Sequence, residues 1–262
     1  MEPAILVALP LAAVVGLSLG LLGGGGSILT VPILSYVLGM PPREAIAASL
    51  FIVGATSAVS AIGHARAGRV RWGTGLLFGA AGMAGAFAGG LLGGLIPGAV
   101  LMVLFAGMMI ATATAMIRGR KPSAASGGGG EQRERPPLAR IVLDGLLVGL
   151  ATGLVGAGGG FLIVPVLNLL GGLPMAVAVG TSLLVIVLKS FAGLGGYLFS
   201  VQLDWAPVLA FTVFAIAGSF IGVRLAGRIP ENALRRGFGV FVLVVGAFVL
   251  VQELPALIGG LA

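Results

Sequence analysis

One lysine stands out as the residue best placed to bind a charged molecule. Lys189 lies inside an apolar run over residues 174–199, at least ten positions from its far end. A helix rises 1.5 Å per residue, so the ammonium would lie about 15 Å from that end, beyond the reach of its stem to water. A buried charge in a bilayer costs about 2.5–3.5 kcal/mol on insertion scales. We therefore expect Lys189 to bind an anion.

The partner of this lysine decides between two interpretations. Asp144, near the end of another apolar run, is the one acidic residue that could neutralise it. A structural Lys189–Asp144 pair, or a contact with backbone carbonyl groups at a kink, is the alternative to anion binding. A lysine without a fixed carboxylate suits a ligand that brings the negative charge itself.

Two glycine runs form the second signal. They read Gly-Gly-Gly-Gly-Ser at residues 23–27 and Gly-Ala-Gly-Gly-Gly at 156–160, and each is followed by a proline, Pro32 or Pro165. Each interior glycine costs about 1 kcal/mol relative to alanine in a helix, so both runs should break the helix near the membrane midplane. The N-terminus of the short helix that follows favours an anion. The expected binding residues are Gly24, Gly25, Gly26, Ser27, Gly158, Gly159 and Gly160.

Glycine can also serve only close packing. We adopt that interpretation for the spaced glycines at positions 85, 89 and 93 and at positions 218 and 222, whose four-residue interval is typical of helix-packing faces. For the two runs we favour binding, because both interrupt a helix at the same place in a duplicated sequence.

Hydroxyl groups accompany the lysine on two apolar segments. Ser182 lies seven residues before Lys189 and therefore shares its helix face. Such hydroxyls also bond to carbonyl groups of their own helix, which is the alternative role. The candidate hydroxyl residues are Ser49, Ser57, Thr181, Ser182 and Ser190, with the amide of Asn168 as a weaker candidate.

Other chemistry finds little support. The chain has no cysteine, and its one histidine, His64, lies at an expected helix end, where an interfacial role is favoured over catalysis. We expect no catalytic residue, no metal and no cofactor. The net charge of +7 does not indicate nucleic-acid binding, because the basic residues fall in loops between apolar runs.

Composition places these residues in a membrane. Hydrophobic residues make up 58% of the 262 positions and charged residues only 9%, against about 25% in soluble domains. Runs such as residues 45–63 and 72–98 approach the ~20 residues of a spanning helix. We expect an all-α membrane protein whose first helix is retained rather than cleaved.

The chain is duplicated. A constant shift of 133 residues aligns its halves without gaps, carrying Pro41 to Pro174, Trp72 to Trp205 and Ser57 to Ser190. We predict a first repeat over residues 1–117, a flexible Gly/Ser-rich cytoplasmic linker over 118–140, and a second repeat over 141–262.

Charge predicts the orientation of the repeats. Each half has five apolar segments, and the second is too short to cross regularly, so it either forms a tight crossing or re-enters. An odd count makes the halves inverted. With both termini outside, 13 of the 15 basic residues face the cytoplasm, leaving only Arg43 outside and Lys189 within a helix.

Two motifs, Gly-Leu-Leu-Gly-Gly-Gly-Gly-Ser at residues 20–27 and Gly-Leu-Val-Gly-Ala-Gly-Gly-Gly at 153–160, are each followed after three residues by Val-Pro. Together with Val-Gly-Thr-Ser-Leu at 179–183, they resemble the sulfite exporter TauE/SafE family of permeases. The resemblance covers the whole chain except the linker. It implies export of sulfite or an organosulfonate such as sulfoacetate across the plasma (inner) membrane without ATP hydrolysis. An anion channel, a permease for another small anion, and a membrane-embedded enzyme remain alternatives, and a homo-oligomer stays open.

Overall fold

The computed structural model describes residues 2–24, 26–118, 138–156, 163–164, 167, 173–225 and 231–259. Every element within these residues is helical. The elements are α1 (Glu2–Leu22), α2 (Ser27–Pro32), the π-helix η1 (Ile33–Val37), α3 (Pro42–Arg66), α4 (Trp72–Leu95), α5 (Gly98–Arg118), α6 (Leu138–Val155), α8 (Met175–Tyr197), α9 (Trp205–Leu225) and α10 (Glu231–Gly259). Five of them, α1, α3, α4, α8 and α9, are long and apolar enough to cross a membrane. The prediction of an all-α membrane protein is confirmed.

Helix starts recur at matching positions of the duplicated sequence. Directly before α3 and α8 stand Pro41 and Pro174, with φ of −52° and −54°. Both are N-cap residues in an extended conformation, with ψ of 141° and 144°, and the proline ring fixes the φ of that conformation. The helices α4 and α9 both begin at a tryptophan, Trp72 and Trp205. The same local signals therefore start equivalent helices in both halves.

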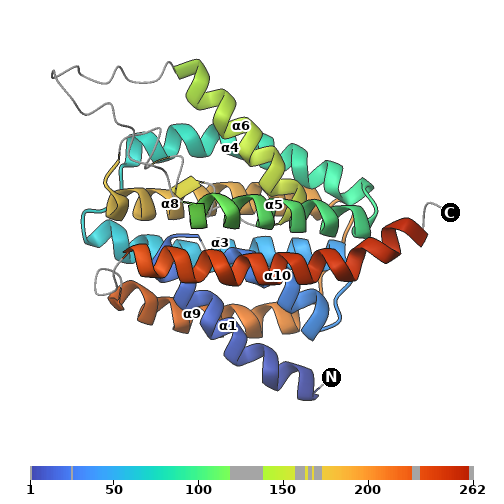
Figure 1. The fold of residues 1–262 in the computed structure, drawn as a ribbon. Helices are drawn as coiled ribbons and strands as arrows, with labels where there is room; N and C mark the ends of the chain where they lie inside the picture. The colour runs from blue at the N-terminus through green and yellow to red at the C-terminus, as the bar shows by residue number, and fades with distance from the viewer. Residues whose placement is uncertain are drawn as a thin grey trace.

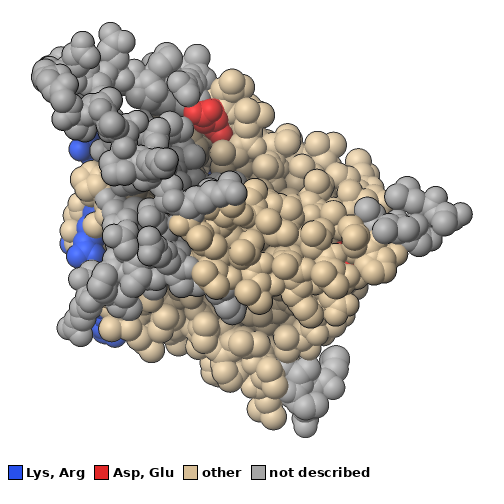
Figure 2. All heavy atoms as spheres, in the orientation of Figure 1, with Lys and Arg blue, Asp and Glu red and all other residues tan. Residues whose placement is uncertain are grey.

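Most helices run along one common direction, which α1 and α6 cross obliquely, and the bundle has two ends (Figure 1). We call the end at which α1 begins and α10 ends the terminal end. The opposite end, at which α3 ends and α4 begins, carries Arg66, Arg69 and Arg71 and is called the basic end. Figure 2 shows the visible Lys and Arg side chains gathered at that end. Because α3 starts at the terminal end and α8 at the basic end, these equivalent helices run antiparallel.

Glycines on α4 and α9 allow these helices to pack closely against helices of the other half. On α4, a Cβ added at Gly85 would overlap the carbonyl oxygen of Leu146 on α6. On α9, a Cβ added at Gly218 would overlap the carbonyl oxygen of Ala13 on α1. The glycines four residues later repeat both contacts one turn further on. The predicted packing role of these spaced glycines is confirmed. Because each contact joins helices from different halves, the two halves are interleaved.

The first glycine run ends α1. Gly23 and Gly24 have φ of 67° and 145°, values that favour glycine, so the helix stops at Leu22. The chain then turns into α2 and η1, whose 11 residues reach only about 16 Å. Tyr36 of η1 donates a 2.8 Å hydrogen bond to Glu253 of α10. The short segment therefore leads back toward the terminal end.

Candidate functional site

Two hydrogen bonds hold the ends of α1 and α6. The Ser182 hydroxyl of α8 shares its proton between the Gly23 carbonyl and the Val179 carbonyl of its own helix, both at 2.7 Å. The Ser49 hydroxyl of α3 donates to the Gly156 carbonyl at 2.9 Å. Gly156 has a φ of 70°, close to that of Gly23. Each serine and each glycine corresponds to its counterpart under the 133-residue shift. The third helix of one half thus fixes the end of the first helix of the other.

The two contacts lie at different depths in the bundle, whereas we expected the two glycine runs to meet near the membrane midplane. Ser49 and Ser182 each lie seven residues after the start of their helix, or about 10 Å along it. Because α3 and α8 start at opposite ends, Gly23 lies toward the basic end and Gly156 toward the terminal end. Gly156 docks closely on α3, since a Cβ there would lie 2.9 Å from backbone atoms of Ile46.

Lys189 lies between these two contacts. Its side chain is 1% exposed, and its ammonium donates to the Thr152 hydroxyl of α6 at 2.9 Å. No carboxylate of the described residues pairs with it, so the alternative Lys189–Asp144 ion pair is not formed. Thr152 lies one turn before Gly156, where α6 ends. The charge is therefore close to the second glycine run.

Glycines also make room for the lysine stem. A Cβ at Gly82 of α4 would lie 2.6 Å from Cδ and 2.9 Å from Cγ of Lys189, and 3.4 Å from the Gly145 carbonyl oxygen of α6. The stem therefore passes through the contact between α4 and α6. Ser182 and Lys189, expected on one helix face, are both buried, but their side chains contact different helices, α1 and α6 respectively.

The remaining predicted hydroxyls fall into two groups. Ser27 donates to the Gly24 carbonyl at 2.7 Å, and Thr181 accepts from the Arg71 backbone N–H at 3.0 Å, so both have backbone partners. Ser57 and Ser190 are fully buried, and their hydroxyls have no hydrogen-bond partner among the residues that the structure describes. These last two occupy equivalent positions near the crossing of α3 and α8, where a Cβ at Gly54 would lie 3.2 Å from that of Ser190. Among the predicted hydroxyls that the structure describes, only these two have no hydrogen-bond partner.

Part of the predicted site lies outside the described residues: Gly25, Gly158, Gly159, Gly160 and Asn168. Gly24 and Gly26 are described and lie between α1 and α2.

Sequence reasoning missed two threonines. Thr152 carried no signal of its own, since an isolated threonine in an apolar helix ordinarily bonds to its own backbone. Thr56 is fully buried with an unpartnered hydroxyl, and the 133-residue shift places it opposite Lys189. Comparison of the two halves at the lysine position could have identified it.

His64, expected at an interface, is 1% exposed, and its Nε2 lies 3.4 Å from the Gly20 carbonyl oxygen.

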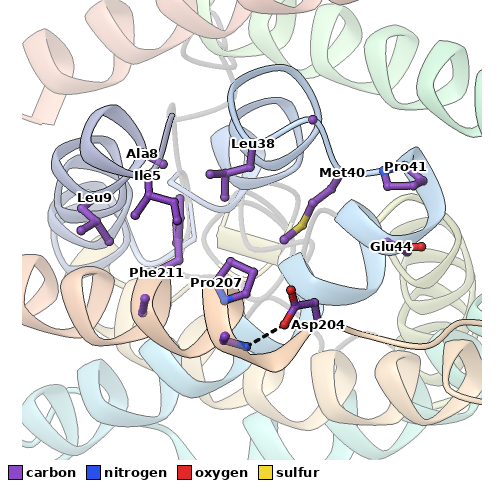
Figure 3. Close-up of a pocket in the computed structure, with 13 residues that line it drawn as sticks. Ile5, Ala8, Leu9, Leu38, Met40, Pro41, Glu44, Asp204, Pro207 and Phe211 are labelled. Atoms are coloured by element: carbon purple, nitrogen blue, oxygen red, sulfur yellow. Dashed lines mark hydrogen bonds between the residues drawn. The ribbon is translucent and has the colours of Figure 1, made fainter. Parts of the chain in front are cut away.

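A pocket of about 430 Å³ opens at the terminal end, between α1, the residues after η1, and the starts of α3 and α9 (Figure 3). Its lining is apolar except for Glu44 and Asp204, and Asp204 accepts a 3.1 Å hydrogen bond from the Ala206 N–H. None of the predicted binding residues lines it. Two carboxylates disfavour an anion, so the pocket is not assigned as the binding site.

Metal binding finds no support in the part of the chain that the structure describes. No group of three or more His, Asp or Glu side chains gathers there.

Apolar helices that can cross a bilayer, interleaved around a buried charge, define a polytopic membrane protein of the transporter class. The model of the family described as "Sulfite exporter TauE/SafE" matches residues 8–249. The chain belongs to this family.

Relatives along the whole chain agree with this class. A probable membrane transporter protein of Xylella fastidiosa is 35% identical, with 97% of this chain and 98% of the relative covered. One from Methanocaldococcus jannaschii is 30% identical, covering 94% and 96%. One from Haemophilus influenzae is 26% identical, covering 92% and 96%. No solved structure matches the chain.

Proposed function

We propose that this protein is a secondary transporter that exports a small sulfur-containing anion, sulfite or an organosulfonate such as sulfoacetate, across the plasma membrane. The family description names sulfite export, and the buried charge is of the sign that an anion requires.

The observation that carries the proposal is the unpaired state of Lys189. A buried charge is ordinarily paired, because the low-dielectric interior leaves an isolated ion at a high free energy. Within the described residues this ammonium has only a neutral hydroxyl as its partner. A bound anion would supply the missing charge.

The equivalent contacts of the two halves support an inverted repeat. The serine–glycine hydrogen bonds and the glycine packing on α1 and α6 each occur twice, 133 residues apart, on helices that run in opposite directions. The arginines at the basic end support a cytoplasmic location for that end and an external location for the termini. In such an arrangement the two halves can alternately open a central site to either side.

Purified protein in liposomes tests the function. We expect efflux of internally loaded sulfite or sulfoacetate that exceeds efflux of sulfate and thiosulfate, and that saturates with concentration. Equal fluxes for all four anions would reject selectivity for sulfite or an organosulfonate.

The same liposomes separate a transporter from an anion channel. A secondary transporter accumulates labelled substrate against its gradient when unlabelled substrate is present on the other side. A channel only dissipates the gradient.

A further inference from the structure

The Lys189 ammonium has one hydrogen-bond partner among the described residues, the Thr152 hydroxyl. We propose that Thr152 is a positioning residue that aims the Lys189 ammonium and leaves two of its three protons for an oxyanion. The inference deepens the proposed function and rests on it.

The orientation of the Thr152 hydroxyl sets the direction of this hydrogen bond. Thr152 is 1% exposed and donates its one hydroxyl proton to its own helix, to the Val148 carbonyl at 2.7 Å and the Gly149 carbonyl at 3.1 Å. Its oxygen can therefore only accept from the lysine. Such a fixed acceptor orients the ammonium toward α6.

Donor counting then indicates the class of ligand. An ammonium has three protons, and Thr152 accepts one of them. The other two have no partner among the described residues, and an unsatisfied buried donor is costly. Two protons on one nitrogen fit a ligand with several oxygens on one central atom, as in sulfite or a sulfonate. A halide offers no such set of acceptors.

The duplication supplies an independent argument. The positions equivalent to Lys189, Thr152 and Gly82 in the other half are Thr56, Leu19 and Ala215. Where the lysine is absent, both the hydroxyl acceptor and the glycine that clears its stem are absent too. The three residues therefore form one unit, present on one side of the pseudo-symmetric bundle.

The test is the affinity of the purified full-length protein for sulfite and methanesulfonate. We expect Thr152→Val to weaken both affinities about tenfold, the scale of one charge-assisted hydrogen bond. Thr152→Ser, which keeps the hydroxyl, should stay within twofold of wild type. The matched control is Thr212→Val, because Thr212 is 5% exposed and makes the same local bond, to Val208 at 2.7 Å, without a lysine partner.

A second pair of variants decides the question if Thr152→Val does not fold. Gly82→Ala would press on Cδ of Lys189, whereas Gly79→Ala, one turn away on α4, would meet only the end of the Leu188 side chain. We expect about tenfold weaker binding for Gly82→Ala and less than twofold change for Gly79→Ala.

The Lys189→Met variant separates anion binding by Lys189 from the positioning role of Thr152. Suppose that Lys189→Met weakens binding, but that Thr152→Val has the same affinity as Thr212→Val, or Gly82→Ala the same affinity as Gly79→Ala. The positioning role is then wrong, and Lys189 remains the anion site. If Lys189→Met itself binds sulfite as wild type does, the proposed site is wrong and the positioning role is wrong with it.

Discussion

Ser182 and Gly23 are joined by a 2.7 Å hydrogen bond across the boundary between the two halves of the chain. Ser49 and Gly156 repeat the bond at 2.9 Å on the other side of the bundle. Each pair ties the broken end of a first helix to the third helix of the opposite half. These bonds link the end of α1 to α8 and the end of α6 to α3.

The first prediction concerns these bonds. Ser182→Ala should lower the free energy of unfolding by about 1–3 kcal/mol, because it leaves the buried Gly23 carbonyl without this donor. Ser219→Ala is the matched control: Ser219 is also fully buried, but its hydroxyl bonds only to Ile216 in its own helix, at 2.8 Å. Thermal unfolding in detergent measures both. A smaller loss for Ser182→Ala than for Ser219→Ala would contradict a tertiary role for this bond.

The second prediction concerns the interleaving of the halves. Gly85→Ala should prevent folding or cost several kcal/mol, because its Cβ would overlap the backbone of α6 at Leu146. Gly107→Ala on α5 meets no atom within 4 Å and should be neutral or stabilising by up to about 1 kcal/mol. Yield and melting temperature of the two variants check the contrast. Similar stabilities would show that α4 and α6 can separate without cost.

The sequence allowed prediction of those features that local chemistry determines. The first helix ends at Leu22, directly before Gly23 and Gly24, because backbone preferences act over a few residues and the φ values of these two positions favour glycine. The duplication made equivalent positions visible without any structure. Lys189 was predicted from its depth in an apolar run, and it is buried.

The rest depends on packing between distant helices. That Thr152 accepts from Lys189, 37 residues away, follows from how α6 lies on α8, which no local pattern encodes. The expected midplane meeting of the glycine runs assumed that inverted halves bring their breaks together. Docking of Gly23 and Gly156 on α8 and α3 instead separates them along the bundle.

The third prediction tests the membrane orientation. The chain has no cysteine, so single cysteines can be introduced at Ser126 in the linker and at Ala262 without a background signal. An impermeant maleimide should label the two from opposite sides, Ala262 from outside. Labelling of both from the same side would refute the inverted topology.

The fourth prediction concerns the glycine runs. Gly25→Leu and Gly158→Leu should abolish transport with tolerable expression, because they add bulk where substrate and backbone are expected to approach. Gly89→Leu should damage folding instead, since a Cβ there already overlaps the Leu150 carbonyl oxygen on α6. Expression and sulfite efflux are measured for all three. Normal transport by Gly158→Leu would mean that the runs serve structure alone.

The last prediction concerns the charge itself. Lys189→Met keeps an unbranched stem of similar volume and removes the ammonium, so a purely structural lysine should tolerate it or gain stability. A lysine that binds the substrate should lose anion affinity worth about 1.5–3 kcal/mol, or roughly tenfold to a hundredfold. Lys189→Arg should keep part of the affinity, because it keeps the charge but not the fit of the stem beside Gly82. Sulfite and sulfoacetate affinities should be compared at matched thermal stability. Equal affinities in wild type and Lys189→Met would assign the lysine to packing or gating and leave anion binding to the helix ends.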